Sequence, residues 1–178
     1  MALTHDCIVT DKDDHHFIIE TNKRVINNSA IDLNDYYSRP VMVRGDKNSE
    51  RFTFEVPLIV EGHDMSECNK IEIHYINKSP DGELKSSDVY EVTDKDVVDE
   101  NGAKVTDKSA VDDLEKLKLR FTWLIPGNAT KYVGTLSFAV KFLCINDAIQ
   151  PPASNIEYAW NTKPVTGANV EEGYDNWV

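Results

Sequence analysis

Apolar and polar residues alternate with a period of two in the second half of the chain. Residues 117–125 carry an apolar side chain at every odd position, with Lys118, Arg120 and Thr122 between them. Successive side chains of a strand point to opposite faces, whereas a helix would scatter these apolar residues around its axis. The same alternation occurs over residues 134–146 and 155–161. The pattern therefore predicts three strands, each buried on one face.

Earlier segments show shorter alternations. Residues 50–57 and 70–77 predict two further strands, the first ending at Pro57, which cannot donate a ladder hydrogen bond. Shorter candidate strands occupy residues 16–20, 24–28, 40–44 and 87–94. The inward positions of the stronger strands give the expected core: Phe52, Phe54, Ile73, Tyr75, Phe121, Trp123, Phe138, Phe142, Tyr158 and Trp160.

Turn residues separate these segments. Pro126, Gly127 and Asn128 lie between the strands at 117–125 and 134–146, which predicts an antiparallel hairpin there. About seven or eight short strands with one polar face each are typical of an antiparallel β-sandwich, either immunoglobulin-like or jelly-roll-like. No helical periodicity of useful length competes with this pattern, so the predicted fold class is all-β.

The ends of the chain lack such clear patterns. We expect a sandwich core at residues 49–161, an N-terminal arm with weak strands at 1–48 and a C-terminal tail at 162–178. The core should then fold without residues 1–40 or 163–178. The tails are either ordinary disordered termini or docking segments that become ordered on a partner. The expected docking anchors are Tyr36, Tyr37, Tyr174 and Trp177, because exposed aromatic side chains favour interfaces.

Residues 93–115, the acidic excursion, interrupt the strand pattern with eight acidic residues against three lysines. This composition predicts a long solvated loop between two strands, with Ser109 and Asp112 as a possible cap for one short helical turn. Clustered carboxylates also suit a calcium ion, but the spacing of a calcium-binding loop is absent. We therefore expect no metal site here.

Cysteine usage gives no sign of a cross-link. The three cysteines are widely spaced and odd in number, which predicts neither a disulfide framework nor a zinc site and favours a reducing compartment. Cys144 continues the apolar alternation, so we expect it to be a small buried side chain.

Charge and motifs exclude several functions. The chain has 178 residues and a formal net charge of −12, which disfavours nucleic acid and anionic membranes as partners. No apolar run approaches the roughly 18 residues of a membrane span, and the first residues do not resemble a signal peptide. Nucleophile, phosphate-binding and zinc-protease motifs are absent, and the stretch from Asp11 to His16 is a weak metal candidate. We expect a non-enzymatic protein without catalytic residues, cofactor or metal.

Four segments within residues 41–162 are distinctive: the turn at 62–66, the strand around Thr122 and Trp123 with the following 128–130, the strand start at 134–138 and the ending at 160–162. Through these segments, residues 41–162 resemble a family of small structural proteins of tailed bacteriophages and prophages of Gram-positive bacteria. The acidic excursion and the polar N-terminal arm are longer than the family pattern. None of the shared segments is catalytic in what the family implies.

The resemblance implies a virion structural protein, assembled in the host bacterial cytoplasm. The expected role is an adaptor or capsid decoration subunit of the head, tail or baseplate, present in several copies and engaged in protein–protein interaction with other phage structural proteins. It could also anchor an appendage for host attachment. The alternative is a carbohydrate-binding β-sandwich for bacterial surface glycans, with a shelf of exposed aromatic side chains. Candidate shelf residues are Tyr36, Tyr37, Tyr90, Tyr132, Tyr174 and Trp177.

Overall fold

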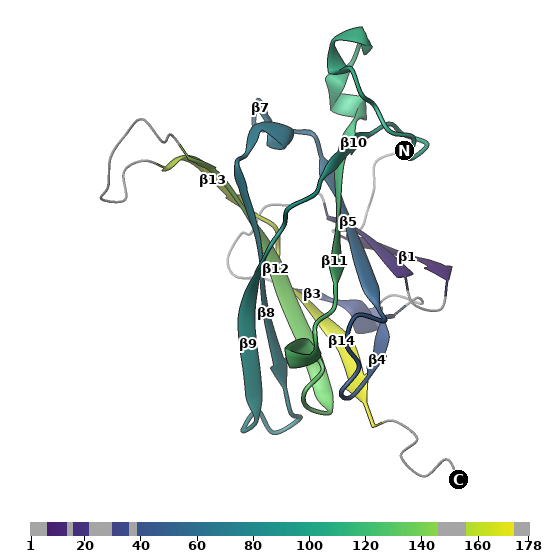
Figure 1. The fold of residues 1–178 in the computed structure, drawn as a ribbon, viewed down its shortest axis with the longest axis vertical. Helices are drawn as coiled ribbons and strands as arrows, with labels where there is room; N and C mark the ends of the chain where they lie inside the picture. The colour runs from purple at the N-terminus through teal and green to yellow at the C-terminus, as the bar shows by residue number, and fades with distance from the viewer. Residues whose placement is uncertain (1–6, 14–15, 22–29, 36–38, 146–155, 173–178) are drawn as a thin grey trace.

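Two β-sheets packed face to face form the molecule (Figure 1). The computed structural model describes residues 7–13, 16–21, 30–35, 39–145 and 156–172. The predicted all-β sandwich is confirmed, although the described residues contain more and shorter strands than the sequence pattern suggested. No helix in these ranges has the length and apolar character needed to span a bilayer.

The first sheet has five strands in the order β1-β2-β5-β11-β10. Their bounds are β1 Cys7–Asp13, β2 His16–Thr21, β5 Arg51–Pro57, β11 Lys118–Leu124 and β10 Asp96–Val98. The strand β11 lies at the predicted position, and the odd-numbered side chains of residues 117–125 are all buried.

The second sheet has seven strands, with β3-β14-β12-β8-β9 as its main path. Beside this path, β13 pairs with β12 and β4 pairs with β14. The bounds are β3 Ile31–Asp32, β4 Val41–Val43, β8 Lys70–Lys78, β9 Lys85–Glu91, β12 Gly134–Ile145, β13 Ile156–Asn161 and β14 Val165–Glu171.

Short elements join the sheets at their ends. The strands β6 Ile59–Val60 and β7 His63–Asp64 form a small hairpin. Five 3₁₀ helices span Leu33–Asp35, Met65–Glu67, Lys108–Ala110, Leu114–Lys116 and Gly127–Ala129.

Both sheets are mixed, which corrects the expectation of a purely antiparallel sandwich. The strand β2 runs parallel to β5, and β14 runs parallel to β3 and β4. All of these parallel pairs involve segments that the sequence pattern had assigned to the arms. These strands can pair in parallel because long stretches of chain separate them, whereas a tight turn joins only antiparallel neighbours.

The predicted boundaries of the arms are therefore wrong. The strand β14 lies inside the second sheet, where Val165 and Val170 are almost fully buried. In the N-terminal segment, Phe17 and Ile19 of β2 pack in the core. Residues 16–21, 31–35, 41–43 and 165–171 belong to the sandwich because their apolar side chains complete its interior.

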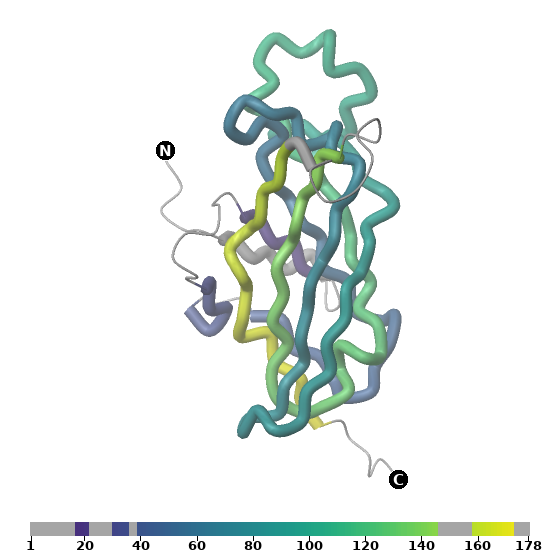
Figure 2. The backbone as a smooth tube through the Cα atoms, turned by 90° about the vertical axis from the view of Figure 1, so that its left-hand side faces the viewer, coloured from purple at the N-terminus to yellow at the C-terminus, as the bar shows by residue number. Residues whose placement is uncertain are grey.

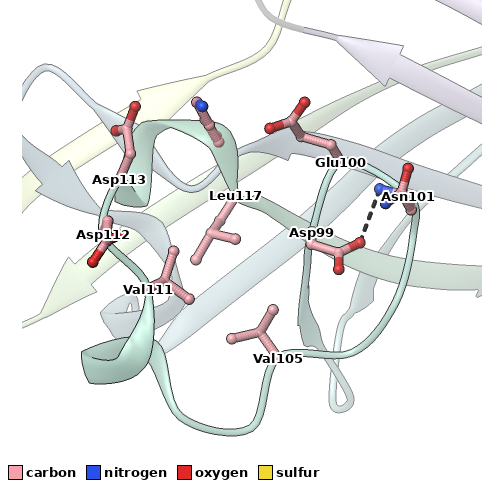
Figure 3. Close-up of a pocket in the computed structure, with 9 residues that line it drawn as sticks. Asp99, Glu100, Asn101, Val105, Val111, Asp112, Asp113 and Leu117 are labelled. Atoms are coloured by element: carbon pink, nitrogen blue, oxygen red, sulfur yellow. Dashed lines mark hydrogen bonds between the residues drawn. The ribbon is translucent and has the colours of Figure 1, made fainter.

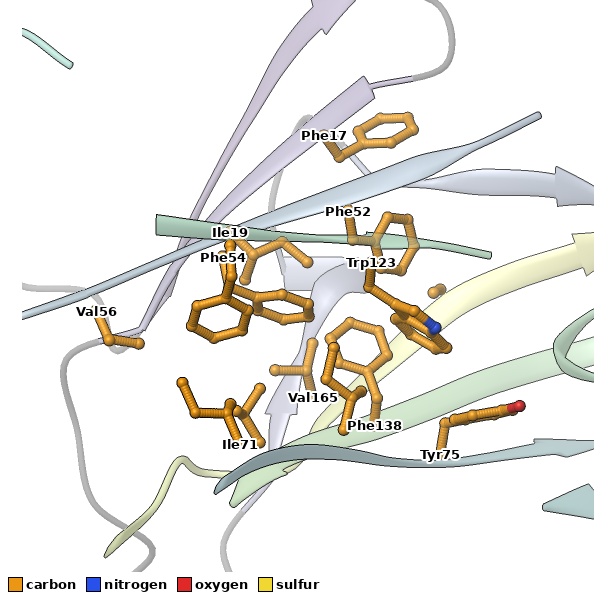
Figure 4. Packing of buried hydrophobic residues seen from close by; sticks show 14 of the residues in the cluster. Phe17, Ile19, Phe52, Phe54, Val56, Ile71, Tyr75, Trp123, Phe138 and Val165 are labelled. Atoms are coloured by element: carbon orange, nitrogen blue, oxygen red, sulfur yellow. The ribbon is translucent and has the colours of Figure 1, made fainter. Parts of the chain in front are cut away.

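Aromatic side chains from both sheets fill the space between them (Figure 4). Nine of the ten expected core residues are buried, and Trp123 contacts Phe52, Tyr75 and Phe138 with ring centroids 4.9–5.9 Å apart. The tenth, Tyr158, is half-buried at the edge of this cluster, and its ring stacks on His63.

The segment between β11 and β12 is a crossover, not the predicted hairpin. The strand β11 belongs to the first sheet and β12 to the second, so their apolar faces oppose each other. Two hydrogen bonds of Thr130 hold this connection in place. The Thr130 hydroxyl donates to the Asp46 carbonyl, and the Thr130 carbonyl accepts from the Gly45 amide. Alternation alone fits either arrangement, because it gives the buried face of a strand but not its neighbour.

A disulfide links Cys68 to Cys144, which overturns the expectation of unpaired cysteines. Cys68 is fully buried just before β8, and Cys144 lies near the end of β12. Asn69 reinforces the link, because its side chain exchanges two hydrogen bonds with the Ile145 backbone. The bond joins positions 76 residues apart, a pairing that spacing cannot reveal.

Candidate functional site

The acidic excursion projects beyond one end of the sandwich (Figure 2). It contains β10 and two 3₁₀ helices, so it is more structured than the solvated loop expected from its composition. Val98 is buried and provides an apolar anchor. Two pockets lie at the base of the excursion, and Lys116 and Leu117 line both.

Asp99 shapes the first turn of the excursion. Its carboxylate accepts hydrogen bonds from the amides of Asn101 and Ala103 at 2.8 and 3.0 Å. Gly102 has a φ of +82°, a value that favours glycine. The turn therefore follows from local residue chemistry, an Asp followed by a Gly in the left-handed region.

Two further aspartates cap the 3₁₀ helices. The Asp107 carboxylate accepts from the Ser109 amide at 3.0 Å, and the Asp113 carboxylate accepts from the Glu115 amide at 3.0 Å. The expected cap pairing of Ser109 with Asp112 is absent, because Asp107 precedes the turn and reaches its amide first. These caps hold the backbone of the excursion in a defined shape.

Arg120 fastens the first turn to the sandwich. Its guanidinium donates to the Glu55 carboxylate at 2.7 Å and to the Gly102 carbonyl at 3.3 Å. Glu55 is nearly buried, so this charge needs the pairing. A side chain at position 102 would also meet Arg120, because a Cβ there would lie 2.9 Å from Nη2.

Two lysines fasten the remainder of the excursion. Lys108 donates to the Asp64 carboxylate at 2.6 Å and to the Ser66 hydroxyl at 2.9 Å. Lys95 donates to the Cys68 carbonyl at 2.7 Å. Burial lowers the pKa of Lys95 below its ordinary value, and the nearby Asp64 charge offsets only part of this effect.

The same contacts set the ionisation of Asp64. Burial alone would raise the pKa of Asp64, but hydrogen bonds from Lys108 and Ser66 outweigh it and hold the pKa below its ordinary value. The Ser66 hydroxyl and amide both donate to Oδ1, at 2.6 and 2.9 Å. The carboxylate is thus a charged anchor for the excursion in the folded protein.

The larger pocket, here the acidic pocket, has a volume of about 450 Å³ and lies between residues 99–101, 105, 111–113 and 116–117. The side chains of Val105, Val111 and Leu117 face one another at its centre (Figure 3). The carboxylates of Glu100 and Asp112 lie around this apolar floor, together with those of Asp99 and Asp113.

The adjoining pocket has a volume of about 200 Å³ and reaches onto the first sheet. Val56, Pro57 and Leu117 give it apolar walls. Thr21 also lines it, and within the described part of the chain the buried Thr21 hydroxyl has no hydrogen-bond partner. Lys118 crosses its edge and pairs with Glu20 at 2.8 Å.

No set of three or more His, Cys, Asp or Glu side chains suited to holding a metal ion occurs in the described ranges. The expected docking anchors Tyr36, Tyr37, Tyr174 and Trp177 lie outside these ranges. Neither pocket was expected from the sequence: the acidic pocket depends on how residues 99–117 fold back on themselves, and the adjoining pocket joins residues 20–21, 55–57 and 115–118, which meet only in the fold. The clustered carboxylates of the excursion were the one signal that pointed to this region.

No family model matches the chain, and no curated protein matches it.

The charged anchor at Asp64 predicts a pH-dependent contribution to stability. Lys108→Met should lower the free energy of unfolding by about 1 kcal/mol at neutral pH. Since the folded-state pKa of Asp64 is lowered, this contribution is complete above the unfolded-state value of about 3.9 and disappears as pH falls through the folded-state pKa. Urea unfolding of both proteins at several pH values measures the difference.

Lys104→Met is the matched control, because Lys104 pairs with Asp96 at 3.4 Å while both side chains are largely exposed. Lys104→Met should leave the free energy of unfolding nearly unchanged at every pH. A Lys108→Met penalty that persisted after Asp64 is protonated would contradict an electrostatic anchor.

Proposed function

We propose that this chain is a non-enzymatic structural protein of a tailed-phage virion. It acts as an adaptor or decoration subunit that docks on a larger head or tail assembly and helps to anchor a host-contact appendage. The resemblance of residues 41–162 to phage structural proteins motivates the assignment. A disulfide suits a particle that leaves the reducing cytoplasm of its host.

The observation that carries the proposal is the position of the large aromatic side chains. Trp123 and Trp160 are buried between the sheets, and the Tyr75 hydroxyl donates to Asn128 at the edge of the core. These rings hold the sandwich together, so they are unavailable to stack on a sugar. This supports a scaffold role over the carbohydrate-binding alternative, for which Tyr90 and Tyr132, both half-buried, are the candidates that lie among the described residues.

Immunogold electron microscopy tests the proposal. Particles from cells that carry the gene would be purified on a density gradient and labelled with antibody against this chain. We expect the chain to co-purify with the particles and the gold label to mark one defined position on the head or tail. Particles from cells lacking the gene are the control.

A chain that stays entirely in the soluble fractions, with unlabelled particles, would refute a virion role. If that soluble protein bound isolated cell-surface polysaccharide, and Tyr90→Ala or Tyr132→Ala abolished binding, the carbohydrate-binding alternative would replace it.

A further inference from the structure

The acidic pocket combines an apolar floor with a rim of carboxylates (Figure 3). Val105, Val111 and Leu117 form the floor, and Glu100 and Asp112 belong to the rim. The side chain of lysine or arginine has the complementary construction, an aliphatic stem that ends in a cation. We propose that the acidic pocket binds a lysine or arginine side chain from an extended basic segment of a partner protein.

The rim carboxylates are available to such a cation. Glu100 and Asp112 are exposed, and neither side chain has a hydrogen bond or ion pair within the described ranges. By contrast, Lys104 and Lys108 form ion pairs with Asp96 and Asp64, respectively. Lys116 is the one cation among the lining residues, against the carboxylates of Asp99, Glu100, Asp112 and Asp113, so the pocket keeps an excess of negative charge that a cation from another chain would balance.

The pocket is formed before a partner arrives. Arg120 ties the turn at Gly102 to the first sheet, and Lys108 ties the middle of the excursion to Asp64. Asp113 caps the 3₁₀ helix that leads into Leu117. Because these contacts order the lining residues in advance, little entropy is lost on binding.

The adjoining pocket supplies an independent observation. Thr21, which lines this pocket, is 1 % exposed, and its hydroxyl has no hydrogen-bond partner among the described residues. A buried hydroxyl without a partner is costly, and a peptide amide or carbonyl is the kind of group that satisfies it. Lys116 and Leu117 border both pockets. A partner segment that places a basic side chain in the acidic pocket can therefore continue over the adjoining pocket.

The charge of the whole molecule favours the same partner. The formal net charge of −12 attracts a basic segment at long range and repels nucleic acid. A protein segment therefore fits better than any polyanion. Binding of a basic segment does not require a phage origin, and the outcome of the particle-labelling experiment does not depend on such binding.

Peptide binding to the purified full chain tests the inference. The probe is an acetylated peptide of alternating glycine and lysine, titrated while the methyl signals of Val105, Val111 and Leu117 are followed by NMR. We expect these methyl signals to shift and saturate. The double variant Glu100→Gln/Asp112→Asn should weaken binding about tenfold.

Two controls separate a specific pocket from general attraction. Glu83→Gln/Glu91→Gln removes the same charge from exposed positions elsewhere and should leave affinity within about twofold. A second peptide with 2,3-diaminopropionic acid for lysine keeps the charges but lacks the stem, and should bind about tenfold more weakly.

Equal losses in both charge variants, or equal binding of both peptides, would overturn the inference in favour of nonspecific attraction. Unshifted methyl signals would overturn it as well. If millimolar calcium raised the melting temperature and displaced the peptide, with both effects reversed by chelator, the pocket would be an ion site instead.

Discussion

Trp123→Ala should lower the free energy of unfolding by about 3–5 kcal/mol. Trp123 is fully buried, and its ring meets Phe52 and Phe138 edge-on and Tyr75 at a tilt. The truncation removes contacts with both sheets and leaves a cavity at the centre of the sandwich. Since total stability is about 5–15 kcal/mol, much of the margin would be lost. Urea unfolding followed by circular dichroism measures the effect.

Two matched variants define the cause. Leu124→Ala changes the next residue, which is 38 % exposed, and should cost less than about 1 kcal/mol. Trp123→Phe keeps an aromatic ring and removes an indole N–H that has no hydrogen-bond partner in the described ranges, so it should lower the free energy of unfolding much less than alanine does. A Trp123→Ala protein with unchanged stability but lost ligand binding would mean that this ring belongs to a binding site.

Ending the chain at Asn161 should unfold the protein. The deletion removes β14, and with it the buried side chains of Val165, Ala168 and Val170. It also removes Thr162, whose hydroxyl accepts a hydrogen bond from the Val140 amide. Burial of each valine contributes about 1.5–3 kcal/mol, so the total loss approaches the stability of a typical domain. Soluble yield and thermal melting of the truncated chain give the measurement.

Deleting only residues 173–178 is the control, because it leaves every residue of β14 in place. That variant should melt within a few degrees of the full chain. If the chain ending at Asn161 also melted within a few degrees of the full chain, β14 would be dispensable and the predicted core boundary at residue 161 would be correct.

Alternation predicted the strands of the core because those strands are regular. In β11 and at the residues that flank it, each inward side chain from Leu117 to Ile125 is buried. The strand β14 escaped prediction because its alternation is interrupted. Its register on β12 shifts between the pairs of Leu136 and Phe138, at a bulge that contains Gly167 with a φ of +85°. A bulge moves later residues to the opposite face, so a period of two no longer describes the segment.

Pairings between distant segments could not be predicted from local patterns. The disulfide between Cys68 and Cys144 and the ion pair between Arg120 and Glu55 both join residues far apart in the chain. The adjoining pocket depends on the same kind of contact, because its lining joins residues 20–21, 55–57 and 115–118. The sequence indicated an unusual acidic segment, and the fold determined that its carboxylates surround an apolar floor.

The parallel pairing of β14 with β3 and β4 affects how the protein would resist mechanical force. The strand β3 pairs with the start of β14 and β4 with its end, and all three run in the same direction, so the start of β3 and the end of β14 lie at opposite ends of this arrangement. A pull that enters through β3 and leaves through β14 therefore slides the strands along each other. Their hydrogen bonds share the load and must break together, whereas an antiparallel pair pulled at one end opens bond by bond. A subunit under tension between two neighbours would gain mechanical strength from this arrangement.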